Sequence, residues 1–525
     1  MRRRTLLAAS AAVLTAPRIG RTQSASTLRF VPQSDLTLLD PVQTTGAVTR
    51  NHGFLIYDQL YGVDESLKPQ PQMAEGHTID DDGRRWTIKL RDGLKFHDGT
   101  PVLARDCAAS VRRWGQKDTF GQSVIAAADE ISAPDDKTIV FRLKRPFPLL
   151  ADALGKANSN ICVMMPERLA KTDPNVQVTE VVGSGPYRFV PKERVVGALT
   201  VYERNPDYVP RPGGAPSFLA GPRVAYFDRV EWKVLPDPAT ASAALQEGEV
   251  DWWELPAFDL LPLLGGKPDL RVETIETFGF FSLLRPNFLY PPFDNENIRR
   301  ALLGAFVQSD FMEAVAGDNP NLWRDHVGYF VPGSTMASDV GLDALPTKLD
   351  ADKVRRDLEA AGYRNEKVVF LVPTDFQTIN QMSEVAADAL KRCGVNVDYQ
   401  AMDWGTMLPR IAKQDPPDKG GWNLFGTWAL GLGLANPAAH AYLRGNGRAG
   451  VPGWYSSAKM EDLRSAWLQA SDVSEQQHIC RDMQALAFQE IPFWPTGTFF
   501  QPSAHRANLI DFVKGAPVFW GVRRA

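Results

Sequence analysis

The chain of 525 residues lacks most of the features from which membrane proteins and disulfide-stabilised proteins are built. Its opening apolar run, residues 6–16, is too short to cross a bilayer, and no other stretch reaches transmembrane length. Only four cysteines are present, and none forms a Cys-x-x-Cys pair. Their spacing assigns no disulfide, so bridges and buried free thiols both stay open for Cys107, Cys162, Cys393 and Cys480.

Sequence motifs for catalysis and cofactor binding are missing as well. None of the seven histidines stands at helical metal-ligand spacing from another or beside a cysteine pair, which gives little support to a zinc site. No Gly-x-Ser-x-Gly motif occurs, so there is no nucleophile elbow. The glycine-rich stretch 431–437 lacks the lysine and the helix start of a phosphate-binding loop. We therefore expect no catalytic residue, no metal and no cofactor.

Basic charge is scarce beyond the N-terminus. Residues 1–25 carry five arginines and no acid, and without them 53 basic residues remain against 62 acidic ones, a net charge of −9. This balance argues against nucleic acid or an anionic membrane as a partner.

The first 25 residues predict an export signal peptide, because three arginines precede the short apolar run. Arg3-Arg4 and the three residues that follow resemble the twin-arginine pattern, although the general secretory route stays open. No cysteine follows the apolar run, so no lipid anchor is expected. The mature protein is therefore expected to be free in the periplasm.

The stretch 86–114 combines a strand, two turns and a helix. Trp86, Ile88 and Leu90 alternate with polar residues, which predicts a half-buried strand. Asp-Gly pairs at 92–93 and 98–99 are turn signals, and a helix is expected from about 103 to 114. His97 stands before the second pair, in a turn rather than on a helix. We therefore interpret it as part of a hairpin and not as a metal ligand of a phosphohydrolase.

Residues 350–430 alternate helices and buried strands. Strand, helix and strand in this order predict parallel pairing with right-handed crossovers, and ligands bind such sheets beyond the carboxyl ends of the strands. Three strand ends should therefore converge, at 374–375, 403–404 and 427–428. The alternative, that Trp404 and Trp428 are only core residues, stays open at this point.

Motifs along the whole chain resemble the periplasmic solute-binding proteins of the peptide/nickel type that feed ABC importers. The most specific is "WTIKLRDGLKFHDGTPVLARDCAASVRRW" at 86–114. "LDPVQTT", "YDQLY", "GSGPYRF", "LQEGEVDWWE", "PFDNENIRRALLGAF" and "EIPFWP" occur in the same order as in that family. This resemblance identifies the stretch 86–114 as scaffold and favours a binding protein over an enzyme.

The resemblance implies an α/β fold with two lobes that close like a clamshell, with an extra subdomain in lobe one (class C type). Lobe one would comprise residues 28–58, 183–278 and 497–525, and the extra subdomain residues 59–182. Lobe two would comprise residues 279–496.

The strand-end argument and the resemblance together give the expected ligand-binding residues, which are Thr45, Thr49, Thr374, Asp375, Asp403, Trp404, Trp428, Gly431 and Trp494. Peptide binders of the family usually carry an acid at the position of Gly431, where it pairs with the ligand's ammonium. Its absence would remove a charge-assisted hydrogen bond of about 1.5–3 kcal/mol, which disfavours unmodified peptides unless Asp375 or Asp403 substitutes.

The resemblance also implies the partners. They are a small-molecule or peptide-like ligand and the permease subunits of an ABC importer, and the protein is expected to be a monomer. Two alternatives stay open, a periplasmic hydrolase on the same scaffold and a chaperone or sensor that uses the same cleft.

Overall fold

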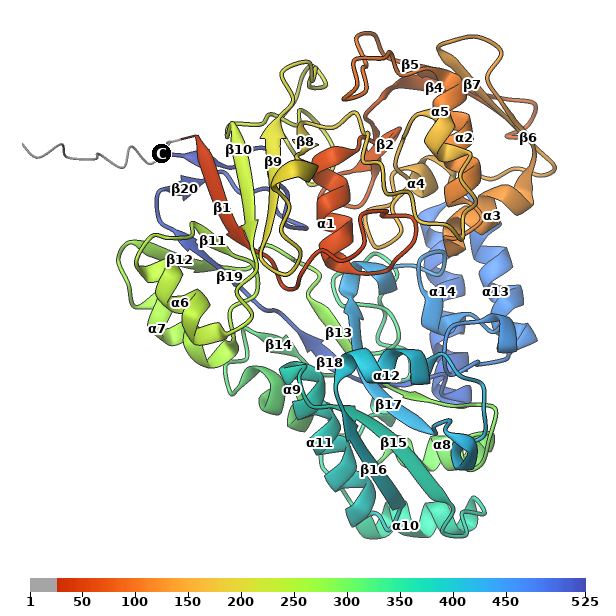
Figure 1. Cartoon of the computed structure of the whole chain (residues 1–525). Helices are drawn as coiled ribbons and strands as arrows, with labels where there is room; N and C mark the ends of the chain where they lie inside the picture. Colours follow the sequence, from red (N-terminus) through yellow and green to blue (C-terminus); the bar gives the residue numbers. More distant parts are fainter. Residues whose placement is uncertain (1–25) are drawn as a thin grey trace, which may run out of the picture.

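The structure is a computed structural model that describes residues 26–525. Two large sheets and one smaller sheet organise the chain (Figure 1). The expected signal peptide lies outside the described residues. No described helix has both the length and the apolar character needed to cross a membrane.

The first large sheet has β1 at its centre, paired in parallel with β10 and β11. Its seven strands, in spatial order, are β12 (Leu270–Glu273), β19 (Ser503–Arg506), β11 (Trp252–Trp253), β1 (Thr27–Val31), β10 (Arg229–Lys233), β9 (Leu199–Arg204) and β8 (Tyr187–Phe189). Helix α1 lies near β8 and β9, and helices α6 and α7 lie near β11 and β12, at the opposite edge of the sheet (Figure 1). Their bounds are α1 (Ala47–Ile56), α6 (Pro238–Gln246) and α7 (Leu261–Gly265).

The second large sheet contains the predicted parallel unit. Its strands, in spatial order, are β14 (Trp323–Arg324), β18 (Trp494–Phe499), β13 (Phe280–Pro286), β17 (Leu424–Leu430), β15 (Lys367–Pro373) and β16 (Asn396–Met402). Strand β15 pairs in parallel with both β16 and β17, as the alternation of helices and strands predicted. Every residue of β13 is buried, because this strand is flanked on both sides and covered on both faces.

Helices surround the second sheet. They are α8 (Glu296–Leu303), α9 (Gln308–Ala316), α10 (Ala351–Ala360), α11 (Gln377–Arg392), α12 (Trp404–Ile411), α13 (Ala458–Gln469) and α14 (Val473–Glu490). Two of these helices, α10 and α11, are followed by a glycine with a positive φ angle, 95° at Gly362 and 83° at Gly394. Glycine alone occupies this left-handed region without a steric cost from Cβ.

The smaller sheet carries the stretch 86–114. Its strands, in spatial order, are β4 (Ala74–Asp80), β5 (Arg85–Leu90), β7 (Thr138–Leu143) and β6 (Ala128–Ser132). The expected strand, turns and helix are confirmed: alternate residues of β5 are buried, and Gly93 and Gly99 have positive φ. The helices here are α2 (Ala104–Trp114), α3 (Thr119–Ala127), α4 (Leu150–Leu154) and α5 (Glu167–Ala170). Two further strand pairs are β2 (Tyr61–Val63) with β3 (Pro69–Pro71), and β20 (Leu509–Ile510) with β21 (Arg523–Arg524).

The chain passes between the two large sheets twice, through residues 274–279 and 500–502, which we call the crossover segments. The first crossover segment packs closely against the end of β18, since a Cβ on Gly279 would lie 2.5 Å from the carbonyl oxygen of Phe499. The three sheets fall within the ranges expected for the lobes and the subdomain, with two exceptions at strand ends. Strand β1 begins at Thr27, one residue before the expected start of lobe one, and β18 continues to Phe499, beyond the expected boundary at 496. The expected domain ranges themselves stay predictions.

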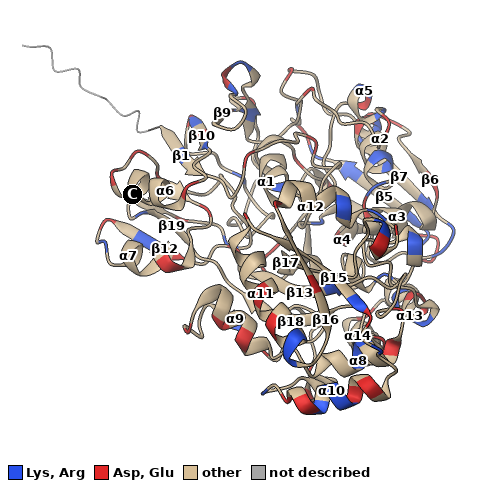
Figure 2. Cartoon of the chain, turned by 60° about the horizontal axis from the view of Figure 1, so that its bottom comes forward, with Lys and Arg blue, Asp and Glu red and all other residues tan. Residues whose placement is uncertain are grey.

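Surface charge is mixed rather than segregated. Lysine and arginine alternate with aspartate and glutamate on outer helices such as α10 (Figure 2). All four cysteines are buried free thiols, which resolves the alternative that the sequence left open.

Candidate functional site

The carboxyl ends of β15 and β16 are joined by hydrogen bonds, as their parallel order requires. The Asp375 carboxylate accepts from the backbone N–H of Trp404 at 2.7 Å. The backbone N–H of Thr374 donates to the carbonyl oxygen of Met402 at 2.9 Å. Both Thr374 and Asp375 are exposed at this edge. The structure therefore brings two of the three predicted strand ends together.

Aromatic rings continue from this edge toward the crossover segments. The Phe376 ring lies 5.7 Å from the rings of both Trp404 and Trp428, edge-on to each. Trp428 in turn meets Phe280 edge-on at 4.8 Å. We call these four residues the aromatic row. Such edge-to-face pairs contribute about 0.5–1.5 kcal/mol each beyond area burial.

The two tryptophans of the aromatic row are only half buried, although one of them is anchored. The indole N–H of Trp428 donates to the hydroxyl of Thr378 on α11 at 3.1 Å. This anchor fixes the ring while leaving part of its surface free. A half-buried, oriented aromatic ring is well suited to contact a ligand.

Asp403 has a structural role, because it is the N-cap of α12. Its carboxylate accepts from the backbone N–H of Thr406 at 2.9 Å and from the Thr406 hydroxyl at 2.6 Å. These two hydrogen bonds hold the pKa of the Asp403 carboxyl below its ordinary value. The residue stays exposed and ionised next to Trp404.

Gly431 has no room for a side chain. It is buried, and a Cβ at this position would lie 2.1 Å from the carbonyl oxygen of Phe278. Its backbone N–H donates to the carbonyl oxygen of Gly279, in the first crossover segment, at 2.8 Å. An acid here would require the backbone to move.

Two of the remaining expected residues are buried, and their polar groups form hydrogen bonds within the protein. Thr49 is buried in α1, where its hydroxyl donates to the carbonyl oxygen of Leu38 at 2.8 Å. Trp494 is fully buried on β18, and its indole N–H donates to the carbonyl oxygen of Arg299 at 3.0 Å. Thr45 is exposed just before α1. The structure therefore places Trp494 in the core, away from the aromatic row.

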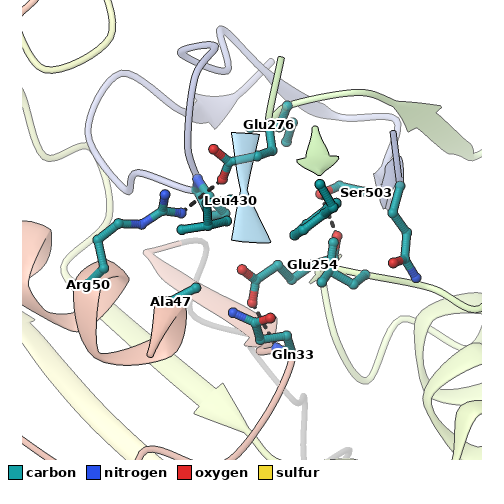
Figure 3. Close-up of a pocket in the computed structure, with 12 residues that line it drawn as sticks. Gln33, Ala47, Arg50, Glu254, Glu276, Leu430 and Ser503 are labelled. Atoms are coloured by element: carbon teal, nitrogen blue, oxygen red, sulfur yellow. Dashed lines mark hydrogen bonds and ion pairs between the residues drawn. The ribbon is translucent and has the colours of Figure 1, made fainter. Parts of the chain in front are cut away.

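A small cavity lies where the two large sheets meet, and the sequence analysis did not identify it. It is lined by Gln33, Ala47, Arg50, Glu254, Leu255, Ile275, Glu276, Phe280, Leu430, Gln501, Ser503 and Pro517. We call it the crossover cavity (Figure 3). It adjoins the aromatic row, because Phe280 belongs to both.

Three charged side chains, Arg50, Glu254 and Glu276, line the crossover cavity. Arg50 on α1 forms an ion pair with Glu276 in the first crossover segment, with 2.8 Å between Nη2 and Oε2. Glu254 accepts from the side-chain amide of Asn51 at 2.9 Å and from the backbone N–H of Gln33 at 2.7 Å. Burial raises the pKa of Glu254 to about 7, although the hydrogen bonds and Arg50 oppose the shift.

His97 is part of the scaffold, as the sequence analysis expected. Its backbone N–H donates to the carbonyl oxygen of Gly183 at 2.8 Å, and its Nε2 lies 3.1 Å from the carbonyl oxygen of Gly185. Burial lowers the pKa of His97 to about 4, so the ring is neutral at pH 7. In the described part of the chain, no three histidine, cysteine, aspartate or glutamate side chains are grouped to hold a metal ion.

Comparison with known proteins agrees with this architecture. Residues 68–446 match the bacterial extracellular solute-binding proteins, family 5 Middle. The chain is 36% identical to a Sinorhizobium fredii protein described as a probable peptide ABC transporter periplasmic-binding protein, with 98% of each chain covered.

Solved structures show the same fold at lower identity. The PBP AgaA of A. tumefaciens R10, in complex with agropinic acid, superposes with a TM-score of 0.78 at 21% identity, covering 95% of this chain and 99% of that one. A dipeptide binding protein from Pseudoalteromonas sp. SM9913, in complex with Met-Leu, gives a TM-score of 0.77 at 19% identity, covering 95% and 100%. These two structures support the two-lobed fold.

Proposed function

Because the chain belongs to the bacterial extracellular solute-binding proteins of family 5, we propose that it captures a peptide-like solute between its two lobes. It is the substrate-binding component of an ABC importer, and the permease subunits of that importer are its partners. The described residues near the strand ends offer hydrogen-bonding and aromatic groups, as a binding site requires.

One observation carries the proposal for the site. The aromatic row and the crossover cavity share Phe280, so rings from the second sheet adjoin polar groups from the first. A ligand placed there would contact both lobes and would favour the closed arrangement by its differential affinity. Residues of the extra subdomain and lobe two already touch, since the Thr119 hydroxyl donates to the carbonyl oxygen of Ala438 at 3.1 Å.

The proposed ligand contacts are a subset of the residues expected from sequence. Trp404 and Trp428 would provide ring surfaces, and the exposed Thr45 and Thr374 would provide polar groups. Asp375 would act by positioning Trp404 through its hydrogen bond to the Trp404 backbone N–H. Gly431 would keep its stretch of backbone close to the first crossover segment. Thr49 and Trp494 are left out, because both are buried with their polar groups engaged. Asp403 would act through the α12 cap rather than by direct contact.

Position 431 carries a glycine rather than an acid, and this restricts which ligands can bind. A ligand that presents a positive charge therefore needs an acceptor elsewhere in the site. Modified peptides and other small organic molecules with an amide-like backbone fit this description as well as free peptides do.

We further propose that the protein works as a monomer, free in the periplasm, after export by residues 1–25. A periplasmic location agrees with the family, and no described helix spans a membrane. Nothing observed favours the hydrolase alternative. The family is a solute-binding family, and the side chain of Asp375 engages the backbone of Trp404 rather than a nucleophile.

The experiment that tests this function is thermal unfolding of the mature protein with defined pools of dipeptides to pentapeptides. A ligand that binds only the folded protein raises the melting temperature. At a hundredfold excess of ligand over Kd, the free energy of unfolding increases by about 2.7 kcal/mol. Stabilisation by one or more pools, lost in Trp428→Ala, is the expected result. No stabilisation by any pool would contradict a peptide-like ligand.

A further inference from the structure

Helix α3, beside the smaller sheet, contacts α13, beside the second large sheet (Figure 1). The Thr119 hydroxyl on α3 donates to the carbonyl oxygen of Ala438 at 3.1 Å. In the other direction, Nη2 of Arg464 on α13 donates to the Ser123 hydroxyl at 3.1 Å and to the carbonyl oxygen of Thr119 at 3.5 Å. We call these four residues the α3 contact. It joins residues as far as 341 positions apart in the sequence.

Arg464 is the buried charge of the α3 contact. Its exposed fraction is 6%, and its Nε donates to the carbonyl oxygen of Pro437 at 3.1 Å. None of its hydrogen bonds to described residues is to a carboxylate, and burial lowers its pKa to about 10. A buried cation needs acceptors in place of the water that it has lost. Two of its three acceptors, on Thr119 and Ser123, belong to α3, so Arg464 is satisfied only while α3 stays in place.

Both sides of the α3 contact are held by hydrogen bonds of their own. The side-chain oxygen of Asn436 accepts from the backbone N–H groups of Ala438 and Ala439 at 3.0 and 3.1 Å, which shapes the turn below α3. Asp118 is the N-cap of α3, where it accepts from two backbone N–H groups of the first turn and forms a buried ion pair with Lys156. The two surfaces are therefore preformed, and the contact can break and re-form without refolding on either side.

The α3 contact is connected to the proposed ligand site by a short stretch of chain. The 3-10 helix η5 (Gly431–Leu434) begins three residues after Trp428, and the turn at Ala438 follows it. A Cβ at Gly433 would lie 3.4 Å from the side-chain nitrogen of Asn158, which belongs to the expected extra subdomain. The chain from Trp428 to Ala438 therefore runs along the same boundary that the α3 contact spans.

The α3 contact shares no residue with the crossover segments. A rotation of lobe two about those segments would therefore separate its donors from its acceptors. The hydrogen bonds across it are polar and few, as is usual for surfaces within one chain that move relative to each other.

We propose that Arg464 is a positioning residue for solute capture, which favours the closed arrangement of the lobes by bonding to α3 and does not touch the solute. The inference rests on the proposed function, because closure matters for binding only if a solute is held between the lobes. Loss of the contact lowers the fraction of molecules that can hold solute, and the apparent Kd rises by the same factor.

The test measures the distance across the α3 contact without any solute. Spin labels are attached at Asp129→Cys and Lys459→Cys, two exposed positions on β6 and α13, while the four native cysteines are buried and stay unlabelled. Double electron–electron resonance then compares this protein with the same protein carrying Arg464→Ala. Arg444→Ala is the matched control, because Arg444 pairs with Glu461 on α13 at 3.0 Å and does not reach α3.

A second variant breaks the α3 contact from the other side. Thr119→Val combined with Ser123→Ala removes both hydroxyls of α3 and leaves Arg464 unchanged. Circular dichroism checks that each variant folds, and this double variant decides the test if Arg464→Ala does not fold.

Arg464→Ala and the α3 double variant should each show a population at longer distance that the parent protein lacks. Arg444→Ala should keep the distance distribution of the parent. An unchanged distribution in the first two proteins, or the same lengthening in Arg444→Ala, would overturn the inference.

A second arm separates this inference from the proposed function. The peptide pool that stabilises the mature protein most should bind Arg464→Ala about three- to tenfold more weakly and Arg444→Ala less than about twofold more weakly. Equal binding to all of these proteins would overturn the role of Arg464 and leave a peptide-like ligand in place. Longer distances in Arg464→Ala, with no pool bound by the wild type, would support the α3 contact and overturn the peptide-like ligand.

Discussion

Asp375 and Trp404, 29 residues apart, are joined by a hydrogen bond of 2.7 Å from the Trp404 backbone N–H to the Asp375 carboxylate. The bond connects the end of β15 to the start of α12. It thereby fixes the backbone position from which the Trp404 side chain extends. A residue that stands at a strand end in the sequence can therefore serve the site by positioning another residue.

Removing this bond should weaken ligand binding. We expect Asp375→Ala to raise the Kd of the best-binding peptide about three- to tenfold, because one hydrogen bond to a charged group contributes roughly 1.5–3 kcal/mol and part of that is recovered from water. Asp375→Asn keeps an acceptor and should change Kd less than about twofold. Titration calorimetry measures both, and equal losses in the two variants would point to a direct contact of the Asp375 charge with the ligand.

The tryptophans of the aromatic row should matter more for binding than for stability. Trp404→Ala and Trp428→Ala should each weaken binding at least about tenfold, or roughly 1.4 kcal/mol, with the fold intact. Trp494→Phe is the matched control, because Trp494 is buried and lies outside the row. It should lower the melting temperature and leave Kd unchanged. Unchanged affinity with a lowered melting temperature in Trp404→Ala and Trp428→Ala would identify both as core residues.

The turn at 98–99 should contribute to stability alone. The Asp98 carboxylate accepts from the backbone N–H of Thr100 at 3.1 Å and from its hydroxyl at 2.6 Å. Asp98→Ala should cost about 1 kcal/mol of unfolding free energy, measured by denaturant titration. His97→Ala should leave ligand affinity unchanged. A metal ion retained by the wild type and lost in both variants would argue for a catalytic site instead.

Acid should destabilise the protein through its buried histidines. Burial lowers the pKa of His97 to about 4 and of His52 and His440 to about 3, against 6.5 in the unfolded chain. The unfolded state therefore binds more protons as pH falls below 6.5, and stability is lost from there down to the folded-state pKa values. Each histidine contributes at most about 1.4 kcal/mol per pH unit. Denaturant titrations between pH 7 and pH 4.5 should show a shallower fall in His97→Asn, and identical slopes would contradict this assignment.

Export should depend on the first residues if the twin-arginine route is used. Arg3→Lys combined with Arg4→Lys should leave precursor in the cytoplasm, while Arg2 keeps the segment basic for the general secretory route. Cell fractionation with immunoblotting measures the distribution. Normal periplasmic amounts of the double variant would contradict the twin-arginine route without affecting the proposal of export.

Local patterns in the sequence predicted the stretch 86–114 and the parallel unit well, because each depends on alternation, turn residues and helix ends within a few residues. The crossover cavity could not be predicted in the same way. Its ion pair joins residues 226 positions apart, and the Asn51–Glu254 hydrogen bond spans 203 positions. Glu254 is one of two acids within "DWWELP", and nothing local in that segment indicates that it is buried.

Trp494 illustrates a second limit. A tryptophan beside prolines near a strand end has the same local signal whether it faces a ligand or the core. Here two aromatic neighbours, Phe293 and Phe306, and the carbonyl oxygen of Arg299 enclose it, and those partners are distant in the sequence, since Arg299 and Trp494 are 195 positions apart. Only the packing of the whole lobe distinguishes it from Trp404 and Trp428.

The measurement that tests the central claim most directly is native mass spectrometry of the mature protein incubated with the peptide pools, followed by denaturation and identification of the released molecule. Capture of a solute between two lobes predicts a complex of one protein with one ligand, and a ligand recovered chemically intact. A released molecule that has been cleaved, or the absence of a complex with any of the pools, would contradict the account.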